Sequence, residues 1–484
     1  MEETRAQKRV AREDLALFIN ACFACTNQAE HYSDARGQAV SIGFLHSYVL
    51  GNYRRLYARC LAAGINHFNQ ATIVSCLLRT GKDTPVDFAA EEGALIRAAL
   101  RGLPPQRVLR LFRTLRRHRV NNRRTRAAIR DWVRSRPAPA FDAVKYRNKL
   151  KHAARHAHLS FGDETGTFLF DYKKQKKFET ELFDRYREAH FSARAIYDLP
   201  LTVAEGFAEK HGVPRAAFLK NIEPRLTAGE RLRLQASAER AGGKAPEIDL
   251  SRTRLTRLVL YVLSLDAERR EARRDELERA IDGAAFRALS RAETTIGAKG
   301  RRVAAVLDRS YSSSGSTEKR RRPLGIAVAA SALLRQAAGE YRAFWTGGCE
   351  DELMVSPRGQ TDLATPLLDA LEWGADLVVI LSDGFENDPP GTVDRVVKAY
   401  RQSKLAPTGQ AIVHVNPVFD AQNFEPRTLG PSIPCVGVRD AEDLPTMLDF
   451  ARFVDGSANF EELDAALARR SQRLIAGLEE EGES

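Results

Sequence analysis

The chain has 484 residues, of which 43% are hydrophobic and 29% are charged, an ordinary composition for a globular protein. It contains no apolar run near the ~18 residues needed to span a bilayer, and no apolar stretch follows the charged N-terminus. Six irregularly spaced cysteines are too few for a disulfide scaffold. We therefore expect a cytoplasmic protein of several domains and exclude secreted, membrane-spanning and wholly disordered classes.

Helical periodicity dominates residues 1–296, where strand-like alternation is nearly absent. Between residues 107 and 158, three successive segments each carry apolar side chains on one face and basic side chains on another. Helix pairs with one apolar seam favour a stacked helical array, although no clean sequence period marks a repeat.

The positive charge of the chain is concentrated in one part of this helical region. Residues 101–155 hold 18 Lys or Arg against two Asp, a net charge of +16, whereas the whole chain carries +12. A basic stretch of this kind attracts polyanions, most plausibly nucleic acid; the alternative is a solvated helix face. The candidate RNA-binding residues are Arg110, Arg113, Arg117, Arg123, Arg124, Arg126, Arg130, Lys149, Lys151, His152 and His156.

From about residue 297 to residue 470, short apolar runs alternate with helical patterns. This alternation predicts a doubly wound α/β domain with a mostly parallel sheet. We expect the domain to fold largely by itself, and we expect residues 471–484 to form an acidic, solvated tail.

Oxygen-bearing side chains follow three of the predicted elements. Asp308, Ser310 and Ser312 come after the first strand, Thr361 lies in a later loop, and Asp383 ends the central strand. Ligand sites of such sheets lie at the carboxyl ends of strands, so these side chains are predicted to converge. Oxygen-only ligands suit magnesium or manganese. The alternative is that they serve as helix caps and turn residues.

This pattern resembles the von Willebrand factor A domain with its metal-ion-dependent adhesion site, over roughly residues 297–470. The resemblance implies that Ser310, Ser312 and Thr361 contact the metal directly, and that Asp308 and Asp383 hold it directly or through water. It also implies an open coordination position that a partner's carboxylate fills.

A basic helical half before such a domain is similar to the Ro autoantigen family, whose helical part is called the TROVE module. The loop Gly359–Asp362 followed by Pro366 is similar to that family's Gly-Gly-Thr-Asp…Pro loop, whereas the segment 310–322 departs from it by being long and basic. The resemblance implies that residues 1–296 form a closed ring of HEAT-like helix pairs. Such a ring binds structured noncoding RNA on its outer basic surface and threads single-stranded ends of misfolded RNA. Bacterial members are associated with exonucleases in RNA quality control.

Two functions stay open on this basis. The first is a nonenzymatic RNA-binding protein of Ro type, whose partners are noncoding RNA and an exonuclease or other acidic protein, with no membrane partner. The second is an adaptor that uses the metal site to capture an acidic protein. An RNA-processing enzyme ranks last because no catalytic residues stand out. Cys22 and Cys25 form a lone Cys-x-x-Cys in a helical pattern, which favours core packing over a zinc site.

Overall fold

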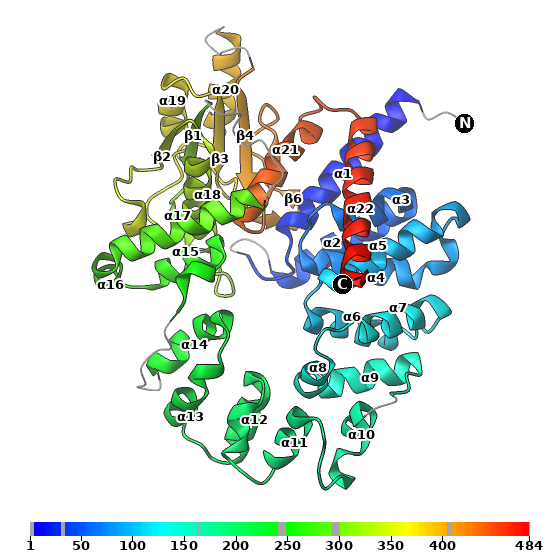
Figure 1. The fold of residues 1–484 in the computed structure, drawn as a ribbon. Coiled ribbons are helices and arrows are strands. Elements are labelled where there is room, and N and C mark those ends of the chain that lie inside the picture. The colour runs from blue at the N-terminus through cyan, green and yellow to red at the C-terminus, as the bar shows by residue number, and fades with distance from the viewer. Residues whose placement is uncertain are drawn as a thin grey trace. The chain divides into compact units, whose positions relative to one another are not determined.

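The computed structural model describes residues 4–30, 34–161, 164–240, 248–291, 301–403 and 409–483. A helical region comes first and a parallel, five-stranded α/β region follows, as predicted (Figure 1). The residues group into two compact units. Unit 1 comprises residues 1–69 and 250–476, and unit 2 comprises residues 70–249 and 477–484. Within the described ranges, no helix has both the length and the apolar character that crossing a membrane requires.

Unit 1 is built on the parallel sheet. In sheet order, its strands are β2 (Glu340–Trp345), β1 (Arg302–Leu307), β3 (Leu377–Leu381), β4 (Ala411–Asn416) and β7 (Cys435–Gly437). Leu307 lies opposite both Trp345 and Leu381 in the register. Strand β3 is buried along its whole length and β1 from Val303 onward, which explains why they are apolar runs without alternation. A short hairpin of β5 (Phe419–Asp420) and β6 (Glu425–Pro426) follows β4.

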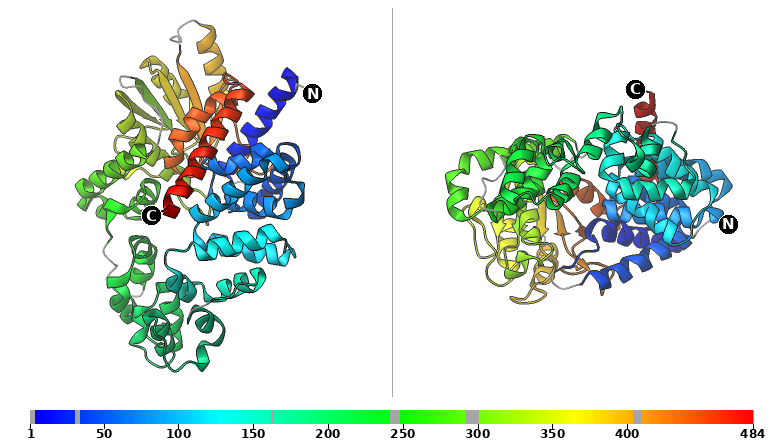
Figure 2. Two further views of the ribbon diagram at one scale, coloured as in Figure 1. Left: turned by 45° about the vertical axis from the view of Figure 1, so that its right-hand side comes forward. Right: turned by 90° about the horizontal axis from the view of Figure 1, so that it is seen from below.

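Helices cover both faces of this sheet (Figure 2). The helices of unit 1 are α1 (Arg5–Ala24), α2 (Ala35–Asn52), α3 (Arg54–Arg59), α15 (Leu255–Ser264), α16 (Ala267–Ala272), α17 (Arg274–Ser290), α18 (Arg322–Ala337), α19 (Ala364–Glu372), α20 (Thr392–Gln402), α21 (Leu444–Val454) and α22 (Phe460–Glu483) up to residue 476. Helices α19 and α20 pack on the face that carries Ala304 and Val306. Helix α18 packs on β1 and β2 from the opposite face, as the usual right-handed crossover requires, and α15 and α17 pack against it.

The N-terminal helices belong to the same unit as the sheet. Helix α1 packs on β6, β7 and α21. The buried side chain of Asn20 donates a hydrogen bond to the Cys435 carbonyl over 2.9 Å and accepts one from the Gly437 amide over 3.2 Å. The predicted boundary near residue 297 therefore marks a change of secondary structure, whereas the compact unit extends across it.

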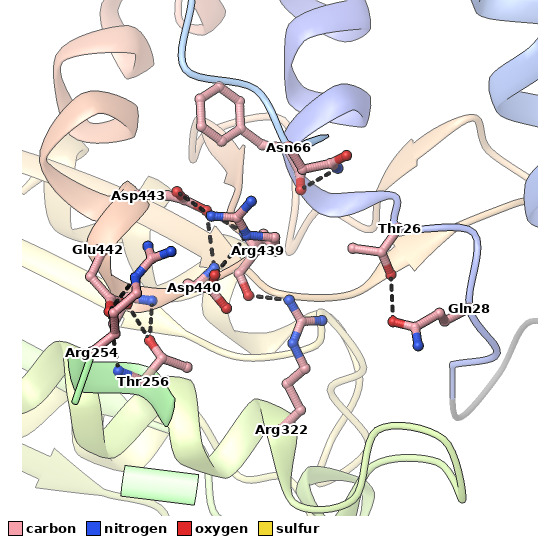
Figure 3. Close-up of polar contacts among 12 residues, drawn as sticks. Thr26, Gln28, Asn66, Arg254, Thr256, Arg322, Arg439, Asp440, Glu442 and Asp443 are labelled. Atoms are coloured by element: carbon pink, nitrogen blue, oxygen red, sulfur yellow. Dashed lines mark hydrogen bonds and ion pairs between the residues drawn. The ribbon is translucent and has the colours of Figure 1, made fainter. Parts of the chain in front are cut away.

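The basic segment that leads into α18 and includes its first residue forms internal contacts of unit 1. Lys319 and Glu30 make an ion pair whose side chains are only 3% and 4% exposed. Arg321 donates to the Leu263 carbonyl, and Arg322 donates to the Arg439 carbonyl. Figure 3 shows this last contact close to a second link, in which the hydroxyl of Thr256 on α15 donates to Glu442. These cations hold elements of unit 1 together.

Unit 2 consists of helices and the turns that connect them, without a strand among its described residues. Unit 2 begins at residue 70, inside α4 (His67–Arg79). Its further helices are α5 (Ala89–Gly102), α6 (Pro105–Arg117), α7 (Arg123–Arg134), α8 (Pro139–Lys145), α9 (Arg147–Ala157), α10 (Glu164–Asp171), α11 (Glu181–Glu188), α12 (Leu201–Lys210), α13 (Arg215–Ile222) and α14 (Ala228–Arg240). Helices close in the chain pack on one another: α9 contacts α6, α7, α8 and α10, and α12 contacts α13.

Two short segments of the chain have local structures set by their side chains. Residues 173–177 continue a 3₁₀ turn and then form coil, because four lysines in five residues repel and provide no apolar stripe. The C-terminal segment 471–484 was expected as a solvated tail, but α22 continues to Glu483. Ser471 is buried and extends the row of Leu463 and Leu467 by one further turn, so the helix is anchored beyond residue 470.

Candidate metal centre and nucleic-acid interface

The predicted metal ligands lie at the topological switch point of the sheet. The chain leaves β1 toward β2 on one side and leaves β3 toward β4 on the other, so the strand order reverses between β1 and β3. Asp308 directly follows β1, and Asp383 lies two residues after β3. Open parallel sheets bind ligands at this position.

Hydrogen bonds between backbones join the loops that carry the remaining candidates. The Tyr311 amide donates to the Gly359 carbonyl over 3.1 Å, which ties the loop after β1 to the loop that carries Thr361. The Thr361 amide in turn donates to the side chain of Asn387, over 2.9 Å. Asn387 comes from the loop after β3, so three separate loops are fixed against one another.

The glycine after Asp383 is required by the backbone. Gly384 has φ +79°, and a Cβ atom there would lie 2.5 Å from the Arg427 carbonyl oxygen. Any other residue would clash or be strained. The Asp-Gly pair at the end of β3 therefore has a structural reason as well as a chemical one.

All five candidate ligands are buried. Asp308, Ser310, Ser312, Thr361 and Asp383 are between 1% and 8% exposed. The two serine hydroxyl oxygens lie 3.2 Å apart, and Asp308 Oδ1 accepts a hydrogen bond from the Ser310 amide over 2.7 Å. Burial, and then the negative charge of Asp383, raise the pKa of Asp308 to about 7.

These residues fit a hard divalent cation. Two like charges held in a buried site are relieved by a cation between them, and a cavity of about 10 Å³ is lined by both Asp308 and Asp383. Among the residues that the structure describes, no three His, Cys, Asp or Glu side chains form a cluster suited to a metal ion. A cation here would thus rely on the hydroxyls of Ser310, Ser312 and Thr361 in addition to the carboxylates.

The basic residues of unit 2 are carried by α6, α7 and α9. Helix α6 starts with Pro105 in its first turn, and α7 starts after Asn122, whose side chain accepts a hydrogen bond from the Thr125 amide over 2.7 Å. Both helices bury their apolar stripe, including Phe112 and Trp132. The basic stripe of each helix therefore faces away from the core.

Most of the predicted RNA-binding residues are exposed or half-buried. Arg110, Arg113, Arg117, Arg123, Arg130, Lys149 and His152 are exposed, and Arg126 and Lys151 are half-buried. Rows at spacings of three and four residues run along α6 (110, 113 and 117) and along α7 (123, 126 and 130). Within the described ranges, none of the Arg and Lys side chains in these two rows or at position 149 makes an ion pair with a carboxylate. Uncompensated charge at this density favours an anionic partner.

Some of these cations gather around His152. Its Nδ1 lies 2.8 Å from a guanidinium nitrogen of Arg116 on α6. Desolvation by neighbouring atoms, and then the charges of Arg116, Arg155, Arg113 and Lys151, lower the pKa of His152. We call these four cations together with His152 the basic cluster.

An aromatic ring lies beside this cluster. The half-buried ring of Phe170 has Lys151 Nζ 5.7 Å and the Arg155 guanidinium 5.4 Å from its centroid. Cations next to an accessible ring are the combination with which proteins bind phosphates and stack bases of single strands. Exposed lysines at positions 173, 174, 176 and 177 follow directly in the chain, of which Lys174 pairs with Asp171.

Two predicted RNA-binding residues have structural roles instead. Arg124 makes an ion pair over 2.6 Å with Glu92, whose side chain is fully buried. His156 is buried, and its Nε2 lies 2.8 Å from the Val120 carbonyl oxygen. Both side chains are held by the core between helices.

Sequence reasoning missed several members of the face. Arg116, Arg155 and Phe170 were not singled out, nor was the lysine run after α10. Aromatic residues interleaved with lysines in the segment 168–177 are the sequence signal for Phe170 and the lysine run.

Cys22 and Cys25 lie in the core of unit 1, as predicted for packing residues. Burial raises the pKa of both thiols, that of Cys25 to about 12.

Comparison with protein-family models and with curated proteins finds no match for this sequence. The functional assignment therefore depends on the geometry of these residues and on the motif resemblance described above.

Proposed function

We propose that this protein is a nonenzymatic RNA-binding protein of Ro type that acts in RNA quality control. The observation that carries the proposal is the basic face of α6, α7 and α9. Its cations in the rows 110, 113, 117 and 123, 126, 130 have no carboxylate partner among the described residues, and a ring, Phe170, lies beside the basic cluster. Arginine and lysine rows bind phosphates without reading sequence, and an aromatic side chain stacks on a base of any identity. Both properties suit RNA with a free single-stranded end.

In this proposal unit 2 belongs to a ring of HEAT-like helix pairs, and the α/β part of unit 1 is a von Willebrand factor A domain. Its bound magnesium or manganese ion would accept a carboxylate of an exonuclease or another acidic protein. Asp308 and Asp383 would provide charge, and the three hydroxyls would complete the ligand set.

RNA binding is tested by fluorescence anisotropy of the full chain with a labelled hairpin that carries a single-stranded tail. The triple variant Arg113→Ala, Lys151→Ala, Arg155→Ala removes three cations of the basic cluster. The matched control Arg5→Ala, Lys220→Ala, Arg342→Ala removes three exposed cations elsewhere. We expect the first variant to weaken binding at least tenfold, and the control to change it less than twofold.

The single variant Phe170→Ser separates stacking from charge. We expect it to weaken binding of the tailed hairpin by roughly 1–3 kcal/mol and to leave binding of a blunt duplex unchanged. If the wild type binds the tailed hairpin no better than a neutral control protein at physiological salt, the RNA-binding proposal is wrong.

A metal-dependent protein adaptor is the second candidate, favoured by exposed aromatic residues in unit 1. Tyr311, between the two metal-site serines, is 72% exposed. Phe44 on α2 is 57% exposed and its ring centroid lies 5.6 Å from that of Phe424, next to the β5–β6 hairpin. Exposed aromatic rings of this kind are typical of a protein interface. Retention of an acidic peptide on immobilised protein with magnesium, and its release by a chelator, would support this candidate.

A further inference from the structure

A second concave site lies in unit 1 on the outer side of α21. Helices α21 and α22, the last turns of α1 and the 3₁₀ turn Cys60–Ala62 enclose a cavity of about 610 Å³. This volume is in the range of cavities that bind small organic molecules. Figure 2 shows α22 running beside α21 and α1.

The floor of this cavity is apolar. Phe23, Met447, Phe453, Leu463 and Leu467 line it, and each is at most 5% exposed. A ligand that fills the cavity must therefore present an apolar or aromatic body to this floor.

The rim of the cavity is strongly cationic. Five arginines line it, against a single carboxylate from Asp449; the arginines are Arg291, Arg452, Arg469, Arg470 and Arg473. The Arg452 guanidinium lies 4.9 Å from the centroid of the Phe453 ring. In the described part of the chain, Arg452 and Arg469 make no ion pair with a carboxylate.

Arg470 is the most deeply placed of the five. It is half-buried and donates a hydrogen bond to the Ala63 carbonyl over 3.2 Å. Its burial lowers the pKa of the guanidinium even though Asp449 acts in the opposite direction. The lining residues Arg452, Arg469 and Arg470 together carry more positive charge than Asp449 offsets, and Arg470 is desolvated. An anion in the cavity would stabilise them.

We propose that this cavity binds a small phosphorylated organic molecule with an apolar or aromatic body. A phosphomonoester brings up to two negative charges, and the planar guanidinium matches its oxygens in a bidentate manner. The body of the molecule covers the Phe23, Met447 and Phe453 floor, which inorganic phosphate alone leaves open. The body is either the base and ribose of a nucleotide or the alkyl chain of an amphiphile. This inference does not depend on RNA binding by unit 2.

The test is isothermal titration of the full chain with three probes: guanosine monophosphate, decyl phosphate and inorganic phosphate. We expect one of the two organic phosphates to bind at least tenfold more tightly than inorganic phosphate. The double variant Arg452→Glu, Arg469→Glu should weaken that binding at least tenfold. Both side chains are exposed, so the fold should tolerate the change. If the glutamate variant does not fold, the variant Arg452→Gln, Arg469→Gln removes the same two charges and replaces it in the titration.

Arg342→Glu is the matched control. Arg342 is also an exposed arginine over a phenyl ring, that of Phe344, but it lies on β2, at the sheet edge opposite β7. Its substitution should leave the affinity unchanged. If guanosine monophosphate binds more tightly, the ligand belongs to the nucleotide class. If decyl phosphate binds more tightly, the ligand belongs to the class of phosphorylated amphiphiles. The proposal is overturned if neither exceeds inorganic phosphate, or if the cavity variants and Arg342→Glu have the same affinity.

Discussion

Substituting Asn20 should destabilise unit 1 far more than a change on the surface of a helix would. The side chain lies in α1, is 4% exposed, and satisfies both the Cys435 carbonyl and the Gly437 amide of the edge strand β7. Asn20→Ala leaves these two buried backbone groups without that partner. Each unsatisfied group costs about 1–3 kcal/mol, so we expect a loss of about 2–6 kcal/mol in the free energy of unfolding.

Urea unfolding of the full chain measures this loss, with Trp345 and Trp373 reporting unit 1 by fluorescence. Asn20→Asp keeps the acceptor for the Gly437 amide but places a buried carboxylate oxygen against the Cys435 carbonyl, so its loss should be at least as large as that of Asn20→Ala. Asn52→Ala on α2 is the matched control, because Asn52 is exposed and bonds only within its own helix turn. If Asn20→Ala and Asn52→Ala both change stability by less than about 0.5 kcal/mol, α1 is not part of the sheet's unit.

Three further predictions concern the candidate sites and the core. Asp308→Ala or Asp383→Ala should abolish manganese binding in isothermal titration while circular dichroism stays unchanged; in the wild type, affinity at pH 6 should be about tenfold weaker than at pH 8, because Asp308 has its pKa raised to about 7 and must lose its proton to bind the ion. If both variants bind manganese with the affinity of the wild type, these residues do not form a metal site. Arg124→Ala should cost about 3 kcal/mol of stability by removing the guanidinium that faces buried Glu92, whereas the exposed Arg130→Ala should cost less than about 0.5 kcal/mol; equal urea midpoints would show that Arg124 is not a core residue. Burial lowers the pKa of His46 to about 4 from an unfolded value of 6.5, so its contribution to stability is complete above pH 6.5 and is lost as the pH falls toward 4. Between pH 7 and pH 5 the wild type should lose about 2 kcal/mol more than His46→Gln, and parallel pH profiles of the two proteins would contradict this.

The α/β part of the fold could be predicted because its signals are local. The strands β1 and β3 are apolar runs followed closely by Asp308 and Asp383 respectively, and parallel strands bring their carboxyl ends to one edge. The convergence of the candidate ligands follows from that rule alone. The sequence near Asn20 has no comparable signal, because its partner Cys435 lies 415 residues away and the contact depends on tertiary packing.

The basic face could be predicted as a charged stretch but not residue by residue. Helical spacing puts positions 149, 152 and 156 in one row, yet His152 is exposed and His156 is buried against the Val120 carbonyl. Arg124 likewise looks like its neighbours in the sequence, and only the position of Glu92 on another helix makes it a core residue. Helical periodicity predicts the side of the helix on which a residue lies. Which other element packs on that side is decided by the tertiary fold.

The salt dependence of RNA binding tests the central claim most directly. If the cations of the basic cluster neutralise phosphates, the logarithm of the affinity of the full chain for a tailed RNA hairpin falls linearly with the logarithm of the salt concentration. The variant Arg113→Ala, Lys151→Ala, Arg155→Ala should flatten this slope by about 2, since each lost phosphate contact removes roughly 0.7–0.9. The control Arg5→Ala, Lys220→Ala, Arg342→Ala should keep the wild-type slope. A wild type whose binding does not respond to salt, or a cluster variant with an unchanged slope, would contradict the account.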